Sequence, residues 1–133
     1  MRLRFRWTAL LAGLMLVSAC APAASGPAPR DRTVISEEEL TALPGGMNAF
    51  EAVQRLRPFW LNVRANRSFN ATTAEVLVYQ GDMRLGSADN LRNIRVSEVR
   101  RLEYFDPAQA VARLPGIGNS RPAGAIIVRM RAG

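Results

Sequence analysis

The chain has 133 residues and a formal net charge of +7, from 18 basic side chains, all of them arginine, against 11 acidic ones. This length predicts a single domain. The chain has no histidine and one cysteine, which excludes an intramolecular disulfide framework, a zinc site of cysteines and histidines, and catalysis by a histidine base.

The first nineteen residues have the pattern of an export signal. Three arginines in Met1–Trp7 are followed by a largely apolar run, Thr8–Val17, and then by the small residues Ser18 and Ala19. As a helix, this run would reach only ~15 Å, about half of the hydrocarbon core of a bilayer. We therefore expect residues 1–19 to be a cleaved secretory signal rather than a membrane span.

The only cysteine follows this segment directly. Residues 16–20, Leu-Val-Ser-Ala-Cys, resemble the lipobox of bacterial lipoproteins. The resemblance implies cleavage between Ala19 and Cys20 and attachment of acyl chains such as palmitate to Cys20, and two or three such chains hold a protein stably in a membrane. Ala21 stands where an aspartate often retains lipoproteins in the inner membrane, so the resemblance implies an outer-membrane anchor with the protein facing the periplasm. The alternative is an ordinary secretory signal with a chance cysteine.

The rest of the chain divides into a tether and a domain. Residues 20–32 combine the cysteine with a Pro- and Ala-rich stretch that lacks apolar periodicity, which is typical of a flexible tether. Residues 33–133 are long enough for one hydrophobic core without disulfides. Without residues 1–19, fifteen arginines face eleven acidic residues, a net charge of +4. We expect no nucleic-acid partner, because no recognition motif is present.

Helix caps mark the first elements of the domain. Thr33–Ile35 is predicted to be a short extended segment. Ser36 followed by the glutamates at 37–39 is typical of a capping box, and Asn48 with Glu51 predicts the start of a second helix.

A proline ends this second helix. Pro58 cannot continue the helical hydrogen bonds. After it, we expect Phe59–Leu61 in the core, a short strand over Leu61–Arg64 and a polar loop over Asn66–Thr73.

The middle of the domain predicts a β-hairpin. Glu75–Gln80 is the clearest strand, Gly81-Asp82 is a turn, and Met83–Leu85 returns as the partner strand. A loop is expected over residues 86–89, followed by one or two short helical turns, the second capped by Ser97 and Glu98. The buried points of these turns are predicted to be Leu91, Ile94, Val96 and Val99.

The last third predicts a strand over Arg101–Phe105, a helix that starts at Asp106-Pro107, and a final strand over Ala125–Met130. The apolar side of this helix is predicted to be Ala108, Val111, Ala112 and Leu114. In order, these elements predict an α+β domain with a small mixed β-sheet and short helices.

This order of elements resembles the plug domain of TonB-dependent outer-membrane receptors. The matching stretches are the strand and Gly-Asp turn at 76–82, Ile-Arg-Val-Ser-Glu-Val-Arg-Arg-Leu-Glu at 94–103, the helices at 48–56 and 108–114, and Gly-Ala-Ile-Ile-Val-Arg-Met-Arg at 124–131. The chain departs from the family at Gln80, where an acidic residue is usual. No barrel-forming sequence follows, so the resemblance implies a free-standing plug-like domain and not a transporter by itself.

The resemblance implies a non-catalytic binding or interaction module of the cell envelope, with an outer-membrane or periplasmic protein as partner and no cofactor. The alternative is a small-ligand-binding accessory protein of an outer-membrane uptake system. The candidate binding loops, by analogy with the apical loops of a plug, carry Gln80, Gly81, Asp82, Gly116, Gly118 and Asn119. We expect no catalytic or metal-binding residue, because neither a nucleophile elbow nor a paired acid motif is present.

Three further features have two interpretations each. Trp60 and Tyr79 could stack on a ligand or pack in the core, and core packing is favoured for Trp60. Asp31–Ser36 could recruit TonB by strand addition or, as we favour, be the tether end that enters an edge strand. An arginine patch could bind anionic lipid or lipopolysaccharide phosphate, or be a solvated surface, which we favour. Its members would be Arg55, Arg57, Arg64, Arg67, Arg100 and Arg101.

Overall fold

The computed structural model describes residues 30–62 and 74–132. The expected signal segment, Ala19, Cys20, most of the tether and the polar loop expected at 66–73 lie outside the described residues, as do Arg64 and Arg67. In the described part, no helix is both long enough and apolar enough to cross a membrane.

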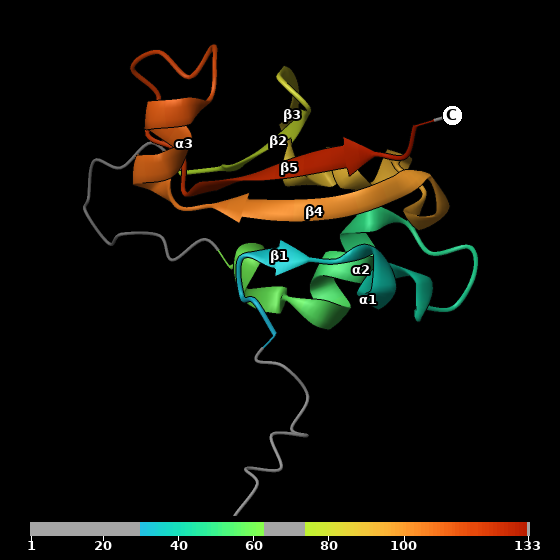
Figure 1. The fold of residues 1–133 in the computed structure, drawn as a ribbon. Helices are drawn as coiled ribbons and strands as arrows, with labels where there is room; N and C mark the ends of the chain where they lie inside the picture. Colours follow the sequence, from blue (N-terminus) through green and yellow to red (C-terminus); the bar gives the residue numbers. More distant parts are fainter. Residues whose placement is uncertain (1–29, 63–73, 133) are drawn as a thin grey trace, which may run out of the picture.

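The centre of the domain is a five-stranded mixed sheet with the strand order β1-β4-β5-β2-β3 (Figure 1). Its strands are β1 (Val34–Ile35), β2 (Val76–Gln80), β3 (Met83–Ser87), β4 (Val99–Phe105) and β5 (Gly124–Met130). β2 and β5 are parallel, and the other neighbouring pairs are antiparallel. β1, β5 and β2 therefore run in one direction and β4 and β3 in the other. The predicted α+β class with a small mixed sheet is confirmed.

Short helices accompany the sheet. They are α1 (Glu37–Thr41), α2 (Ala49–Leu56), α3 (Pro107–Arg113) and the 3-10 helices η1 (Pro58–Trp60), η2 (Ala88–Asn93) and η3 (Val96–Glu98). The predicted capping box at Ser36 is present, and the predicted helix start at Asn48 is a capping box as well. The Ser36 hydroxyl accepts from the backbone N–H of Glu39 at 3.3 Å, and the Asn48 side chain accepts from that of Glu51 at 2.9 Å. Each glutamate accepts in return from the N–H of its capping residue, so local hydrogen bonds start both helices.

The two faces of the sheet are covered unequally. One face packs against α1, α2 and the 3-10 helices and buries the larger apolar cluster, which includes Trp60, Leu102, Val53, Ile126 and Val128. The other face is covered by α3 and the loop after it, over a smaller cluster of Leu77, Tyr79, Ala110, Ile117, Ala125 and Ile127. Figure 1 shows α3 at the end of the sheet where β4 ends and β5 begins. The remainder of this second face has no helix over it in the described part of the chain.

Packing explains one glycine of the last strand. Gly124 is buried, and a Cβ added there would lie only 2.5 Å from the Tyr104 hydroxyl oxygen. The Tyr104 ring occupies this space and stacks on Trp60, with 5.6 Å between ring centroids. The first residue of the Gly-Ala-Ile-Ile segment therefore has to lack a side chain.

The hairpin is confirmed, but its second strand is longer than predicted. β3 continues to Ser87, so the loop predicted over residues 86–89 is wrong. The pairing with β2 skips Leu85, which is the extra residue of a β-bulge. Gly86 adopts a φ of 122°, and a Cβ there would lie 2.8 Å from the Asn90 side-chain nitrogen. The glycine that indicated a loop instead permits this bulge beside η2.

The segment after α2 also differs from the prediction. Trp60 is fully buried, whereas Phe59 is 47% exposed and Leu61 is half-buried. Pro58 starts η1, and Leu61 forms a turn after it, so the described start of the strand predicted over 61–64 is wrong. One 3-10 turn directs neighbouring side chains about 120° apart, which lets Trp60 reach the core while Phe59 does not.

The four apolar residues predicted to be buried around η2 and η3, Leu91, Ile94, Val96 and Val99, are all buried. The predicted cap is wrong, because η3 follows Arg95 and has no side-chain cap; Ser97 and Glu98 lie inside the turn.

The predicted start of α3 is confirmed, but its predicted buried side is wrong. Asp106 accepts from the Gln109 N–H at 2.8 Å and caps the helix. The buried residue is Ala110, whereas Val111 is 53% exposed. The other predicted members, Ala108, Ala112 and Leu114, are exposed or half-buried. In a helix of about two turns only one central position faces the sheet, and the short side chain of Ala110 allows close approach.

Candidate functional site

An open depression of about 580 Å³ lies at the end of the sheet opposite α3. At this end, the C-terminal ends of β1, β5 and β2 meet the first residues of the oppositely running β4. The lining residues come from four parts of the chain: Ser36, Glu37, Gln80, Gly81, Arg100, Arg101 and residues 128–130. Sheet pairing therefore assembles a surface that no single stretch of sequence contains.

Three arginines dominate this depression. Arg101 pairs directly with Arg129 across β4 and β5, so both side chains leave the same face of the sheet. Val99 pairs with Met130, which makes Arg100 the extra residue of a β-bulge. A bulge re-aims side chains and increases the local twist. Because of it, Arg100 and Arg101 both line the depression although they are consecutive in a strand.

One carboxylate serves two of these arginines. Glu103, whose side chain is only 14% exposed, forms ion pairs with Arg101 and with Arg129, the latter at 3.7 Å between Nη2 and Oε2. Arg100 forms no ion pair with any of the eleven acidic side chains, all of which lie within the described residues. Since a guanidinium offers five N–H donors, this cluster has donors that the described protein groups do not occupy.

The structure separates the two candidate loops. Gln80 and Gly81 line the depression, whereas Asp82 in the same turn does not. Gly116, Gly118 and Asn119 do not line it either. Their loop lies against the hairpin, because the Tyr79 hydroxyl donates to the Pro115 carbonyl at 2.8 Å and the Arg84 guanidinium donates to that of Gly116 at 3.2 Å. The two loops thus border the same face without forming one site.

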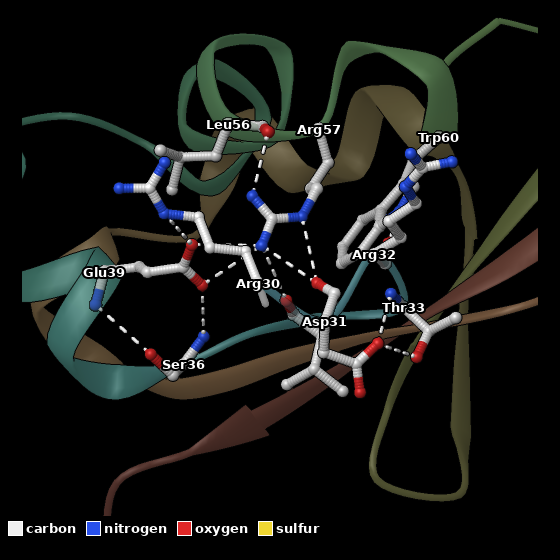
Figure 2. Close-up of polar contacts among 10 residues, drawn as sticks. Arg30, Asp31, Arg32, Thr33, Ser36, Glu39, Leu56, Arg57 and Trp60 are labelled. Atoms are coloured by element: carbon white, nitrogen blue, oxygen red, sulfur yellow. Dashed lines mark hydrogen bonds and ion pairs between the residues drawn. The ribbon is translucent and has the colours of Figure 1, made fainter. Parts of the chain in front are cut away.

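A different arginine, Arg57, is only 6% exposed and is surrounded by acceptors (Figure 2). Its guanidinium donates to the carbonyls of Asp31 at 2.9 Å, Val34 at 3.2 Å and Leu56 at 3.0 Å. It also forms an ion pair with Glu39, with 3.0 Å between Nη2 and Oε1. These contacts join the start of the domain to α1 and α2.

The predicted arginine patch is therefore wrong for Arg57. Arg55 is exposed on α2, while Arg100 and Arg101 lie at the depression. Arg129, a member of the depression, was not predicted from the sequence. The only sequence signal for it is its place in the final strand, since β-pairing with β4 brings it to Arg101.

The two aromatic candidates are core residues. Trp60 and Tyr79 are both fully buried, so neither ring is available to stack on a ligand. The Trp60 indole N–H donates to the Arg32 carbonyl at 2.8 Å. Together with Arg57, this bond fixes Asp31–Ser36 at the edge of the sheet, in agreement with the interpretation of this segment as a tether end that enters an edge strand.

Two ionisable groups near the Asp31–Ser36 segment, Tyr104 and Asp31, have shifted pKa values. Burial raises the pKa of the Tyr104 phenol above its ordinary value, and the nearby Asp106 carboxylate acts in the same direction. Hydrogen bonds from the side chain and backbone of Thr33 lower the pKa of Asp31. Both groups lie where β1 meets the end of β4, away from the depression.

Within residues 30–62 and 74–132, no three side chains of the metal-binding types lie together in a group that could hold a metal ion. The glutamates at 37–39 serve instead at the start of α1, where they complement the helix dipole.

Comparison of the chain with protein-family models, with curated proteins and with solved structures finds no match. The resemblance to plug domains and to lipoproteins stays a prediction from the residues quoted above.

Proposed function

We propose that this protein is a lipid-anchored lipoprotein of the bacterial cell envelope, held in the outer membrane through Cys20, whose plug-like domain binds a partner protein without catalysing a reaction. The observation that carries the binding role is the depression at the strand ends. There, the second face of the sheet lacks a covering helix among the described residues, and three arginines gather.

The order of the elements supports a plug-like domain. The order on which the resemblance rests is a strand with a Gly-Asp turn, a partner strand, a strand, a helix and a Gly-rich loop before a last strand. These elements are β2, β3, β4, α3 and β5, in the same sequence order.

The composition of the depression supports a binding surface. Arginine is enriched at protein interfaces and recurs among the residues that contribute most to affinity. Arg100 is exposed, and the side chain of Arg101 is 52% exposed. A partner carboxylate or backbone carbonyl can therefore reach their N–H donors.

The sequence before the domain supports anchoring close to a membrane. Ten chain steps separate Cys20 from Arg30, which span at most about 36 Å when fully extended. A domain on such a short tether meets envelope components and not distant soluble ones.

The binding role is tested by capture from solubilised envelope with the full chain as bait. We expect a reproducible envelope protein to be retained by the native chain and by Arg55→Ser, and to be lost with the double change Arg100→Ser and Arg129→Ser. Arg55 is the matched control because it is an exposed arginine on α2 that does not line the depression. Equal retention by all three chains would contradict the proposed surface.

The anchor has a separate test. Cys20→Ser removes the only thiol in the chain, so we expect the protein to stay unprocessed or to leave the membrane fraction. Normal processing and normal membrane fractionation of this variant would contradict lipidation at Cys20.

The depression also favours a second candidate function, the binding of a small ligand. Its volume of about 580 Å³ falls in the range of ligand sites, roughly 300–1,000 Å³. A thermal-shift screen of siderophores, glycans and metal chelates separates the two functions. A ligand that raises the melting temperature of the native chain but not of Arg100→Ser favours this candidate.

A further inference from the structure

We infer that the depression is a binding site for a phosphate group, held between Arg100, Arg101 and Arg129. The inference rests on the proposed function, because it names the chemical class that the proposed binding surface would take. It follows from the balance of charges, the donors left open and the β-bulge that brings the arginines together.

The balance of charges favours a dianion. Three guanidinium groups line the depression, and the single carboxylate of Glu103 pairs with two of them. Two positive charges are left without a counter-charge. The other acid at the rim, Glu37, is paired with Arg131 at 3.4 Å and so is not a strong repulsive charge. A phosphate monoester carries close to two negative charges at neutral pH and matches this excess better than a monoanionic carboxylate.

The donors also suit phosphate. A guanidinium presents its N–H groups as a planar fork that matches two phosphate oxygens at once. The side chains of Arg100 and Gln80 form no hydrogen bond with another described residue, and the Ser36 hydroxyl accepts a bond from Glu39 but still has its own proton to donate. Three kinds of donor therefore converge on one open volume from β4, β2 and the residue after β1.

The bulge makes this geometry specific to the site. In a regular strand, Arg100 and Arg101 would point to opposite faces. The extra residue opposite Met130 brings both to the depression, and Arg129 approaches from the next strand. Bulges commonly re-aim side chains next to functional sites.

A soluble phosphate and a headgroup of the anchoring membrane share this chemistry, and the second arm of the test separates the two sources. The chain enters the domain beside the end of β4, where the Tyr104 N–H donates to the Thr33 carbonyl at 2.7 Å. The depression lies at the other end of β4, at Arg100 and Arg101. The described end of the tether is nevertheless close to its rim, because Ser36 follows Thr33 by three residues and lines the depression.

The test is a titration of the processed, lipidated protein with inorganic phosphate, monitored by calorimetry at an ionic strength held constant with sodium chloride. We expect saturable binding at one site by the native chain and by Arg55→Ser. Arg100→Ser and Arg129→Ser should each weaken it about tenfold, the effect of losing one charge-assisted hydrogen bond. Arg100 has no ion pair in the fold, so its variant should fold normally.

A second arm separates the two sources of phosphate. The lipidated chain is placed in phosphatidylcholine vesicles with or without phosphatidic acid, and the titration is repeated. Unchanged phosphate affinity assigns the site to soluble phosphates. A fall in affinity with phosphatidic acid, absent in Arg100→Ser, assigns it to a lipid headgroup.

Two results would overturn the inference: no saturable phosphate binding, or an equal loss in Arg55→Ser and Arg100→Ser. Failure of the inference is distinguishable from failure of the proposed function. Capture of a partner that depends on Arg100 without any phosphate binding leaves the proposed function standing. Phosphate binding without partner capture supports the small-ligand candidate instead.

Discussion

The molecule uses arginine in two opposite ways, at the covered face and at the open end of the sheet. Arg57 is almost fully buried, and three backbone carbonyls and Glu39 take up its donors. At the depression, Arg101 and Arg129 share one carboxylate and Arg100 has none. The difference teaches that the partners of a guanidinium, and not its charge, decide whether it holds the fold or is available to a ligand.

The domain should therefore lose stability when Arg57, the arginine of the covered face, is removed. Arg57→Ala leaves three carbonyls and a partly buried carboxylate without their donor, so we expect the free energy of unfolding to fall by about 3 kcal/mol. Urea unfolding of the full chain, followed by tryptophan fluorescence, measures it. Arg55→Ala, two residues earlier in the chain and exposed, should change stability by less than about 0.5 kcal/mol. Similar losses in the two variants would break the comparison.

The next largest effect is expected at Gly124, also on the covered side through its contact with Tyr104. Gly124→Ala forces the tyrosine ring off Trp60, at a cost of about 1–3 kcal/mol. The matched control is Gly45→Ala, since a Cβ at that exposed glycine meets nothing within 4 Å. If thermal unfolding shows both variants to be as stable as the native chain, the close contact between Tyr104 and Gly124 is contradicted.

Alkaline pH should destabilise the fold through the same residue, Tyr104. Because the pKa of Tyr104 is raised in the folded state, the unfolded chain releases this proton first, near the ordinary tyrosine value of about 10. The stability that the neutral phenol contributes is present below that pH and is lost as the pH rises through the folded-state value. We expect the free energy of unfolding to decline above about pH 10, and to decline less steeply in Tyr104→Phe. An identical decline in both chains would contradict the role of this phenol.

The smallest effect is expected at the open end. Arg100→Ser removes an exposed side chain without an ion pair, so the free energy of unfolding should stay within about 0.5 kcal/mol of the native value. The same urea unfolding measures it. A loss as large as that of Arg57→Ala would show that Arg100 has a structural role and would contradict the difference between the two arginines.

The local parts of the fold were predictable from the sequence. The caps at Ser36, Asn48 and Asp106 depend on partners three residues away, and each is present as predicted. The alternation of β2 also holds, with Val76 and Val78 on one face and Tyr79 on the other. These signals are complete within a few residues and need no tertiary contact.

What the sequence could not show depends on partners far along the chain. Arg57 meets the Asp31 carbonyl across 26 residues, and no local pattern distinguishes it from exposed Arg55. Arg129 lies at the depression because β5 pairs with β4, which places it opposite Arg101. Arg100 is the extra residue of β4 at this point. Gln80 and Gly81 line the depression because they stand at the end of β2, a position that local strand and turn signals predict. The loop at Gly116 lies against the hairpin instead, where its carbonyl accepts from Arg84.

The central claim is that the arginine cluster of the depression is open to a ligand while the donors of Arg57 are taken up by the fold. It is tested most directly by the guanidinium Nε–H signals of the ¹⁵N-labelled full chain. Inorganic phosphate should shift the signals of Arg100, Arg101 and Arg129 saturably and leave that of Arg57 in place. Shifts of similar size at Arg57, or no saturable shift at the three arginines of the depression, would contradict the account.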